Sequence, residues 1–589
     1  KLLVTEKNGA VILTVTDKAE DINRFWLRVE AAEDEHIYGC GEQMSYFDLR
    51  GRHFPLWSSE PGVGRDKTTY VTWRSDVEKG GDYYNTNYPE PTYVSSRRYY
   101  LHMDTTAYGD FDFRNPHYHE LQCWNVPGFI RIEAAPTFVE LLEKLTAFLG
   151  RQPELPEWVY NGLIIGAQGG NQRSFGIVEK SLEKGIKVSG LWCQDWCGKR
   201  VTSFGKRLQW DWHYHKEMYP DLPKHIEELH ARGIKFLGYI NPYLVNDGEL
   251  YAEGKKRGVF AKKADGSDYL VDFGEFYCGV VDFTNPEAYR WFKDEVIKKY
   301  TLDIGIDGWM ADFGEYLPTD DLVLSNGVSP MIEHNHWPAL WAKCNYDAVK
   351  ESGKLGQVVY FMRAGGTGSQ KYCTLLWAGD QSVDFSRHDG LCTVICAALS
   401  SGMVGCGLNH CDIGGYTSLF DNCRTKEVFL RWAEMAAFMP VMRTHEGNRP
   451  DTNFQYYDDE DCMEQLARLV DIYTMLAPYT KTLVAENAAK GTPVMRPLFL
   501  HYEDDPRSYT EQFEYLYGPD LLVAPVWQSG KTEWEVYLPG DEWVHLWTGK
   551  AYGKGTHTVP AAMGDIPVFC RKGSRWTELF HSIRAKYGK

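Results

Sequence analysis

Short runs in which apolar and polar residues alternate fill the first part of the chain. Runs such as VILTVT, RFWLRVE and TYVSSRRYYLHM are separated by Gly, Pro, Asn and Asp, a pattern typical of antiparallel strands joined by turns. The pattern predicts an N-terminal antiparallel β-sandwich over residues 1–152. Pro153 and Pro156 then mark a boundary, after which the pattern of apolar and polar residues changes.

Continuous apolar runs alternate with helical patterns such as LPKHIEELHARG between residues 153 and 489. Eight strand-like runs can be counted: WVYNGLIIGAQG, VSGLWCQDW, IKFLGYINPY, GIDGWMADFGE, VVYFMRAGG, TLLWAGDQ, MVGCGLNHCD and MPVMRTHEG. Because parallel strands buried on both faces read as apolar runs, the pattern predicts an α/β fold, a (β/α)8 TIM barrel over residues 153–489. Short strands then resume and predict one or two small C-terminal β-domains over residues 490–589.

The run from Leu391 to Leu408 carries no charged residue over 18 positions. A run of that length is a candidate for a transmembrane helix. Because Gly402, Gly405 and Gly407 interrupt the run, a buried helix followed by a buried strand fits the pattern better. We therefore expect no integral membrane segment.

Composition and charge narrow the classes of partner. The 589 residues carry 63 Lys and Arg against 81 Asp and Glu, a net charge of −18 that argues against binding to nucleic acid or to an anionic membrane surface. The 14 cysteines are scattered without a C-x-x-C pair, which fits a reducing, cytoplasmic location. No secretory signal pattern stands at Lys1; whether a segment precedes it stays open, as does assembly into a homo-oligomer.

Polar and ionisable side chains follow nearly every predicted barrel strand. They are Gln168, Gln194, Asp195, Asn241, Asp312, Glu315, Arg363, Asp380, Asp412 and His445. In this fold the chemistry sits at the carboxyl ends of the strands, and polar groups gathered there are costly to desolvate unless they meet partners or a ligand. Their convergence predicts an enzyme.

Two acids, Asp312 after the fourth run and Asp380 after the sixth, are placed to face one pocket. A carboxylate pair can cleave an acetal: one acid attacks or stabilises the oxocarbenium-like carbon, and the other protonates the leaving oxygen. Spacing alone also leaves metal-assisted chemistry open, because acids at a barrel mouth bind divalent ions. The aromatic neighbours Trp309 and Trp377 favour a sugar substrate.

The loop after the second run, from Trp196 to Trp210, holds four basic residues and no acidic residue. The basic residues are Lys199, Arg200, Lys206 and Arg207. Arg offers a planar fork of donors and an indole N–H adds another, so the loop fits a substrate with a negative charge. A solvated or ion-paired surface loop is the alternative.

Three further motifs are better explained by structure than by chemistry. The GGTG segment lacks the Lys-Ser/Thr ending of a phosphate loop and predicts a turn. His334 and His336 lack a third metal ligand at a familiar spacing, so we expect them to be surface or packing residues. His410 and Cys411 are neighbours on one strand and point to opposite faces, so they cannot form a catalytic pair.

The segments WMADFGE and WAGD resemble the nucleophile and acid/base signatures of glycoside hydrolase family 31, the α-glucosidase and α-xylosidase family. The resemblance extends over nearly the whole chain. It is greatest for bacterial members that release sulfoquinovose, a 6-sulfonated glucose, from sulfolipid-derived α-glycosides. The segments that carry this closer resemblance are GAQGG, CQDW, TSFGKRLQW, INPY, FMRAG, DIGGY and MRTHEGNRP.

The resemblance implies roles for individual residues. Asp312 would be the nucleophile and Asp380 the acid/base of a retaining mechanism. Arg207 and Trp210 would contact the sulfonate, and Tyr416 would reach it through an ordered water. Ring hydroxyls would be held by Gln168, Gln194, Arg363 and His445.

The resemblance further implies a small-molecule sulfosugar glycoside as the partner, with no cofactor and no metal. A sulfonate stays ionised at physiological pH and so supplies the negative charge that the basic loop fits. Two alternatives stay open: an α-glucosidase or α-xylosidase of the same family that acts on neutral sugars, and a catalytically silent carbohydrate-binding barrel. The natural aglycone, whether glycerol, phosphoglycerol or diacylglycerol, also stays open.

Overall fold

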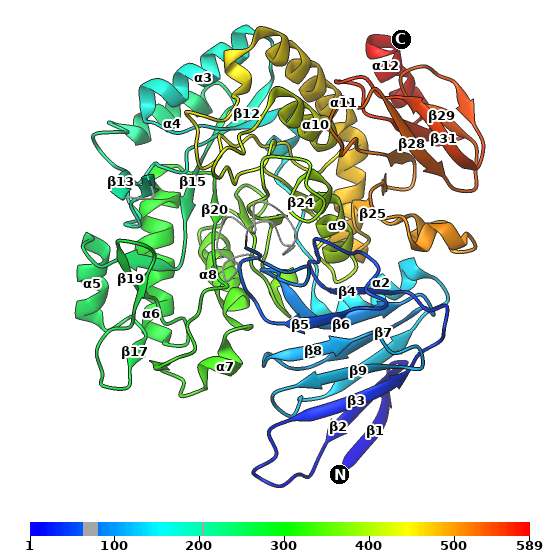
Figure 1. Cartoon of the computed structure of the whole chain (residues 1–589). Coiled ribbons are helices and arrows are strands. Elements are labelled where there is room, and N and C mark those ends of the chain that lie inside the picture. The colour runs from blue at the N-terminus through cyan, green and yellow to red at the C-terminus, as the bar shows by residue number, and fades with distance from the viewer. Residues whose placement is uncertain (63–80, 203–204) are drawn as a thin grey trace.

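The computed structural model describes residues 1–62, 81–202 and 205–589. In chain order they form a sandwich of antiparallel sheets, a parallel barrel and a smaller C-terminal β-unit (Figure 1). This order confirms the predicted fold class, an α/β TIM barrel flanked by an N-terminal sandwich and a C-terminal β-domain.

Two antiparallel sheets make up the N-terminal unit, drawn in blue to cyan in Figure 1. The larger sheet has the order β1 (Leu2–Lys7), β2 (Ala10–Val15), β10 (Ile130–Ala134), β7 (Tyr99–Met103), β6 (Pro89–Ser95) and β4 (Ile37–Gly41). The smaller sheet has the order β3 (Phe25–Glu30), β9 (Tyr118–Cys123), β8 (Gly109–Asp112) and β5 (His53–Leu56). Apolar side chains from both sheets, among them Phe54, Tyr93 and Phe111, form their common core.

A helix, α2 (Phe138–Leu149), ends the segment in which the sequence pattern indicates only strands. Thr137 caps it, because its side chain accepts a hydrogen bond from the N–H of Glu140. Leucines recur on one face at helical spacing and are buried. Because α2 contacts β7 and β10 of the sandwich and also helix α11 of the barrel, it joins the two units.

Seven parallel strands form the sheet of the barrel. Their order follows the chain: β11 (Leu163–Gly166), β12 (Val188–Trp192), β15 (Lys235–Ile240), β20 (Gly308–Ala311), β22 (Val359–Met362), β23 (Leu375–Trp377) and β24 (Asn409–His410). Nearly all their residues are buried, as expected for strands with helices outside and a filled interior.

The eighth apolar run forms no regular strand among the described residues, yet it closes the barrel. Parallel bridges join Ile164 of β11 to Arg443 and Ile413 to Thr444, so the run sits between the first and last strands. The N–H of Thr444 donates to the carbonyl of Ile164 at 3.0 Å. The count of eight was therefore right for the barrel, although the last position is held by isolated bridges.

Helices surround the barrel sheet (Figure 1). They are α3 (Asn171–Glu183), α4 (Leu222–His230), α5 (Glu249–Arg257), α6 (Pro286–Trp291), α7 (Pro330–Glu333), α8 (Trp337–Glu351), α9 (Leu391–Gly402), α10 (Lys426–Ala436) and α11 (Glu460–Lys490). Helix α9 forms the first 12 residues of the uncharged run, as predicted, whereas residues 403–408 are buried without regular structure and lead into β24, which begins only at Asn409. Within the described part of the chain, no helix is long and apolar enough to cross a membrane.

Smaller strands and single helical turns decorate the barrel. The strands are β13 (Lys199–Thr202), β14 (Gly205–Leu208), β16 (Tyr243–Val245), β17 (Lys262–Lys263), β18 (Leu270–Asp272), β19 (Tyr277–Val280) and β21 (Leu322–Val323). The 3-10 turns are η1 (Glu157–Asn161), η3 (Leu302–Ile304), η4 (Ser369–Lys371) and η5 (Tyr456–Asp458), and η2 (Phe292–Lys298) is a π-helix that continues α6. The predicted turn at GGTG lies just before η4.

The interface between barrel and sandwich explains the position of His334, one of the two histidines considered as metal ligands above. The ring of His334 stacks on Trp57 of the sandwich at 3.9 Å between centroids. Its two ring nitrogens face the carbonyls of Leu317 and Ser58, both at 2.6 Å. His334 is therefore a buried packing residue.

The C-terminal unit, orange to red in Figure 1, is mainly antiparallel. Its larger sheet has the order β25 (Met495–Arg496), β26 (Tyr515–Tyr517), β27 (Leu521–Val523), β32 (Val568–Arg571), β29 (Trp543–His545) and β30 (Ala551–Tyr552). The strands β28 (Glu533–Leu538) and β31 (Gly555–Pro560) pair separately, and η6 (Leu498–Leu500), η7 (Pro506–Tyr509) and helix α12 (Thr577–Tyr587) complete the unit. Arg431 of α10 ties it to the barrel by donating to the carbonyls of Lys531 and Ala561.

Barrel closure leads to a test at Gly166, the last residue of β11. A Cβ at this position would lie 2.2 Å from the backbone oxygen of Thr444 and 3.0 Å from a ring carbon of Trp192. Because neither the carbonyl nor the buried indole can move freely, we expect Gly166→Ala to lower the free energy of unfolding by about 1–3 kcal/mol. A lower melting temperature in a thermal scan would report this change.

Gly176→Ala is the matched control. Gly176 lies in helix α3, where a Cβ would meet nothing within 4 Å. Alanine is favoured over glycine inside a helix by about 1 kcal/mol, so this variant should melt at the same temperature as the parent or higher. Equal melting temperatures for Gly166→Ala and the parent protein would contradict the proposed closure.

Candidate active site

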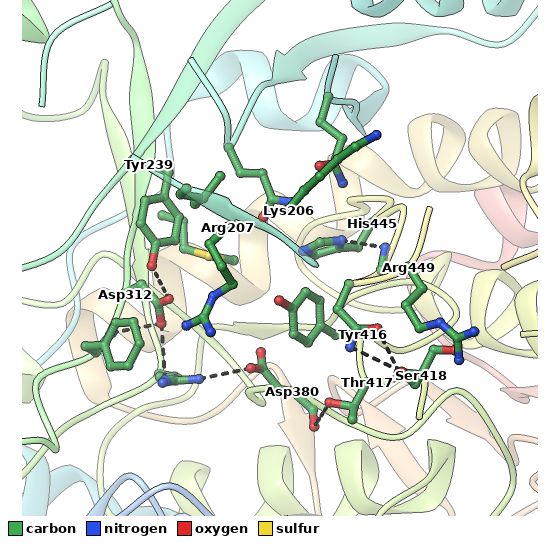
Figure 2. Close-up of a pocket in the computed structure, with 18 of the residues that line it drawn as sticks. Lys206, Arg207, Tyr239, Asp312, Asp380, Tyr416, Thr417, Ser418, His445 and Arg449 are labelled. Carbon is green, nitrogen blue, oxygen red and sulfur yellow. Dashed lines mark hydrogen bonds and ion pairs between the residues drawn. The ribbon is translucent and has the colours of Figure 1, made fainter. Parts of the chain in front are cut away.

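A cavity of about 710 Å³ opens at the carboxyl ends of the barrel strands. All nine residues to which the resemblance assigns a role line it. They are Gln168, Gln194, Arg207, Trp210, Asp312, Arg363, Asp380, Tyr416 and His445. Figure 2 labels Arg207, Asp312, Asp380, Tyr416 and His445 among them. The volume lies within the range of small-molecule sites.

Arg363, just after β22, is the centre of the charged groups in this cavity. Its Nε lies 3.1 Å from Asp312 Oδ1, and one of its terminal nitrogens lies 3.2 Å from Asp380 Oδ2. The other terminal nitrogen lies 2.6 Å from Glu315 Oε1. Glu60 Oε1 lies 3.8 Å from the terminal nitrogen that faces Asp380. The guanidinium is almost fully buried, so these ion pairs act in a medium where charges interact strongly. The two acids predicted to pair are thus bridged by one cation.

Asp312 is held by two hydrogen bonds besides the ion pair. Tyr239 Oη donates to its Oδ2 at 2.5 Å, and the N–H of Phe313 donates to its Oδ1 at 2.8 Å. Phe313 has a φ of +59°, a left-handed conformation that turns the chain sharply after the strand. The Asp312 carboxylate is therefore fixed in position and surrounded by donors.

Asp380 follows β23, and its carboxyl group meets an environment that opposes ionisation. Burial raises its pKa well above the usual value, and the negative charges of Glu60 and Asp312 add to this, while Arg363 acts in the opposite direction. The proton is therefore kept on Asp380 well above the pH at which an exposed aspartate loses it. One acid can thus donate a proton beside another that is hydrogen-bonded as an anion.

Four polar residues at the ends of predicted strands lie behind the cavity wall instead of lining it. Glu315 binds Arg363, and its burial raises its pKa to about 7. Asp412 pairs with Arg443, which also donates to His410 at 2.9 Å. The other two are Asn241, which donates to Tyr239, and Asp195, which pairs with Lys199. Glu315, Asn241 and Asp195 thus contact residues that do line the cavity.

The basic loop folds as a hairpin of β13 and β14, and most of its charge is neutralised locally. Lys199 lies 3.0 Å from Asp195, Arg200 lies 2.7 Å from Asp247, and Lys206 lies 3.8 Å from Asp451. For these three residues the ion-paired alternative was therefore correct. Arg207 reaches the cavity, and its guanidinium lies 5.4 Å from the Phe276 ring.

Aromatic rings complete the wall near the hairpin. Trp210 packs edge-on against Phe273, Phe276 and Phe313, with centroids 4.6 to 5.3 Å apart. On the other side, Tyr416 meets His445 at 4.9 Å. Such flat walls suit the apolar face of a sugar ring.

His445 is positioned as a neutral donor. Its Nδ1 accepts a hydrogen bond from the N–H of Gly447 at 2.9 Å, so the proton of the neutral ring sits on Nε2. Burial lowers its pKa well below the usual value, and Arg443 and Arg424 lower it further. His445 therefore stays uncharged at neutral pH.

The sequence pattern missed several cavity residues. Glu60 comes from the N-terminal sandwich, where no barrel pattern could point to it. Tyr239 lies inside the third run, one residue before the end of strand β15, and only its proximity to the INPY segment could have drawn attention. Arg449 also lines the cavity and was not singled out, whereas Lys206, which lines it too, belongs to the basic loop named from the sequence. Among the described residues, no group of three or more His, Cys, Asp or Glu side chains is placed to hold a metal ion.

Comparisons with known proteins agree with the geometry. Residues 154–483 match the model of the glycosyl hydrolases family 31 TIM-barrel domain. Residues 491–574 match the C-terminal domain of that family, and residues 2–112 match its N-terminal galactose mutarotase-like domain.

Individual relatives are similar over almost the whole chain. A sulfoquinovosidase of Escherichia coli K12 is 55% identical over 98% of this chain and 86% of its own length. A sulfoquinovosidase of Agrobacterium fabrum is 57% identical over 99% of this chain and 88% of its own. A solved family 31 sulfoquinovosidase from E. rectale, in complex with the aza-sugar inhibitor IFGSQ, is 72% identical with a TM-score of 0.99, covering 100% of this chain and 88% of its own.

The charge cluster generates a test of the Asp380 pKa. Asp312→Asn removes a negative charge that opposes ionisation of Asp380, so we expect the pKa of Asp380 to fall. Glu60→Gln should shift it in the same direction. Carboxyl ¹³C NMR titration of aspartate-labelled protein would measure both shifts.

Asp541→Asn serves as a control for that titration, because Asp541 is exposed on the C-terminal unit. This variant should leave the pKa of Asp380 unchanged. A pKa of Asp380 that stays the same or rises in Asp312→Asn would contradict the electrostatic account.

Proposed function

Because this chain belongs to glycoside hydrolase family 31, we propose that it is a retaining α-glycosidase that releases sulfoquinovose from α-sulfoquinovosyl glycosides such as those derived from sulfolipid. The observation that carries the proposal is that Arg207 and Trp210 line the same cavity as Asp312 and Asp380. The two acids are bridged by Arg363. A neutral substrate would give Arg207 no anionic partner in the ligand.

In the proposed mechanism Asp312 attacks the anomeric carbon while Asp380 gives its proton to the aglycone oxygen. The hydrogen bonds from Tyr239 and Phe313 support Asp312 as the anion. The raised pKa supports Asp380 as the acid. Once Asp312 carries the sugar its charge is gone, the pKa of Asp380 falls, and Asp380 can take a proton from water.

Recognition of the sulfonate is assigned to Arg207 and Trp210, with Tyr416 acting through a water molecule. Arg207 supplies a fork of charge-assisted donors, and the Trp210 indole supplies one more. Trp210 is almost fully buried against three phenylalanine rings, which fixes its orientation. A tetrahedral group with three oxygens at C6 fits such a set of donors.

The ring hydroxyls are assigned to Gln168, Gln194, Arg363 and His445. The glutamine amides can each donate and accept, and His445 offers its Nε2–H. Arg363 already contacts two carboxylates, so a hydroxyl near it would share its donors. We also assign Arg363 a second role, which is to fix the positions of the Asp312 and Asp380 carboxyl groups relative to each other.

Location and assembly stay predictions. All 14 cysteines are free thiols and 13 of them are buried, which is consistent with the proposed cytoplasmic location. Assembly into a homo-oligomer stays a prediction from the sequence.

Substituting the two acids separately tests the mechanism. Asp312→Asn should abolish turnover of every glycoside, because no nucleophile remains. Asp380→Asn should lower kcat/KM, which reports the step in which the aglycone leaves, by about 10²–10⁴-fold on an alkyl sulfoquinovoside, the usual contribution of a general acid. The loss should be much smaller for 4-nitrophenyl sulfoquinovoside, because a nitrophenolate leaves without a proton. Equal losses on both substrates would contradict the role of Asp380.

Substituting Arg207 tests the substrate. Arg207→Ala should lower kcat/KM on an aryl sulfoquinovoside. The fall should correspond to a loss of about 2–5 kcal/mol of transition-state stabilisation, the scale for loss of one partner of a buried charge pair. Activity on the matching aryl glucoside should not fall. Arg200→Ala, on the same hairpin but paired with Asp247, is the control and should change neither rate.

The alternatives predict different results from the same assay. An α-glucosidase or α-xylosidase would prefer the neutral glycoside, and Arg207→Ala would affect both substrates equally. A carbohydrate-binding barrel without catalysis would form no product from either. Product analysis by NMR separates all three.

A further inference from the structure

A second cavity, of about 400 Å³, lies on the C-terminal unit and shares no residue with the active-site cavity. It is formed by the segment between η7 and β26, the segment that follows β27, and strand β28. Aromatic and acidic side chains dominate its lining. Those used below are Phe513, Glu514, Trp527, Gln528, Trp534 and Tyr537.

Two tryptophans form a corner in this cavity. The rings of Trp527 and Trp534 lie 5.9 Å apart at an interplanar angle of 85°. Phe513 backs Trp527 at 4.6 Å and a tilt of 47°. Both indoles are half-buried and line the cavity, so the corner presents apolar surface to whatever enters. Large half-exposed aromatic side chains grouped in this way are typical of a binding surface.

The protein's own cations already occupy the other aromatic faces. The guanidinium of Arg387 lies 4.7 Å from the Phe513 ring, and that of Arg507 lies 4.3 Å from the Tyr537 ring. Arg507 is further fixed by Glu511 at 2.7 Å. Among the described residues, no cation lies over the ring of Trp527 or Trp534. The corner is therefore suited to a neutral apolar face.

Glu514 supplies an unpartnered polar group in the same cavity. The residue is only 5% exposed, and its Oε2 accepts a hydrogen bond from the N–H of Tyr537 at 3.1 Å. Its Oε1 is buried and has no hydrogen-bond partner among the described residues. Burial raises the pKa of Glu514 well above the usual value, which favours the protonated carboxyl. A buried polar atom without a partner is costly, which favours a ligand group that can pair with it.

We propose that this cavity is a second carbohydrate site, which binds a neutral hexopyranoside away from the active site. The C–H face of the sugar would lie on the Trp527–Trp534 corner. Its hydroxyls would pair with Glu514 and with the amide of Gln528, both of which can donate and accept. The lining carries four glutamates against Arg507 and Lys531, and Arg507 is already paired with Glu511, so the local charge disfavours a sulfonated sugar.

Binding can be measured with the full chain carrying Asp312→Asn, so that no probe is consumed. The probe is methyl α-D-glucopyranoside, followed by saturation-transfer NMR and calorimetry up to about 50 mM, a range that covers weak millimolar sites. We expect binding that is weakened roughly tenfold or more by Trp534→Ala and by Trp527→Ala, the scale for an aromatic anchor. Glu514→Gln, which keeps the shape of the side chain, should weaken it less.

Trp26→Ala is the matched control, because Trp26 is an exposed tryptophan on the N-terminal sandwich, 58% accessible. It should leave binding unchanged. Binding that survives Trp534→Ala belongs to another site and would overturn the proposal, as would the absence of any binding. Tight binding of choline at the same corner, in place of the glucoside, would also overturn it. Hydrolysis of a sulfoquinovoside by Trp534→Ala in the otherwise unaltered chain should proceed at the parental rate, so failure of this proposal is distinguishable from failure of the proposed function.

Discussion

The buried guanidinium of Arg363 determines the electrostatics of the barrel mouth. Four carboxylates surround this one cation, and the burial of the group prevents water from compensating the excess negative charge. Such an excess is relieved by protonation, and the raised pKa values of Asp380 and Glu315 show where the protons are held. The same cluster therefore places Asp312, which accepts hydrogen bonds from Tyr239 and Phe313, beside a carboxyl group whose burial favours its protonated form. The proposed acid–base chemistry would depend on one arginine and the acids packed around it.

Much of the fold and most of the site could be predicted from the sequence, for a physical reason. Parallel strands are buried on both faces, so they leave continuous apolar runs, and the polar residues that end them are gathered at one mouth. That reasoning found Asp312, Asp380 and Arg363 without any knowledge of their contacts. The eighth run was also found, although it forms bridges and not a regular strand.

The features that escaped prediction depend on contacts between distant segments. A count of charges in the basic loop gives four cations, but the pairing of Arg200 with Asp247 and of Lys206 with Asp451 is visible only in three dimensions. Similarly, Asp412 and Glu315 end apolar runs as Asp380 does, yet neither lines the cavity. Asp412 pairs with Arg443, and Glu315 pairs with Arg363. A pattern along the chain identifies the strand end, and packing decides on which side of the wall the side chain lies.

Glu60 has a consequence for how this protein is built. It reaches the cavity from the N-terminal sandwich, accepts a hydrogen bond from Tyr316 at 2.5 Å and lies close to Arg363 of the barrel. The sandwich is thus a part of the reaction chamber and not a detachable appendage. A barrel inherited, expressed or recombined without its own sandwich would lose one of the charges that tune its acid. Exchange of the sandwich between relatives would therefore alter the charge around Arg363.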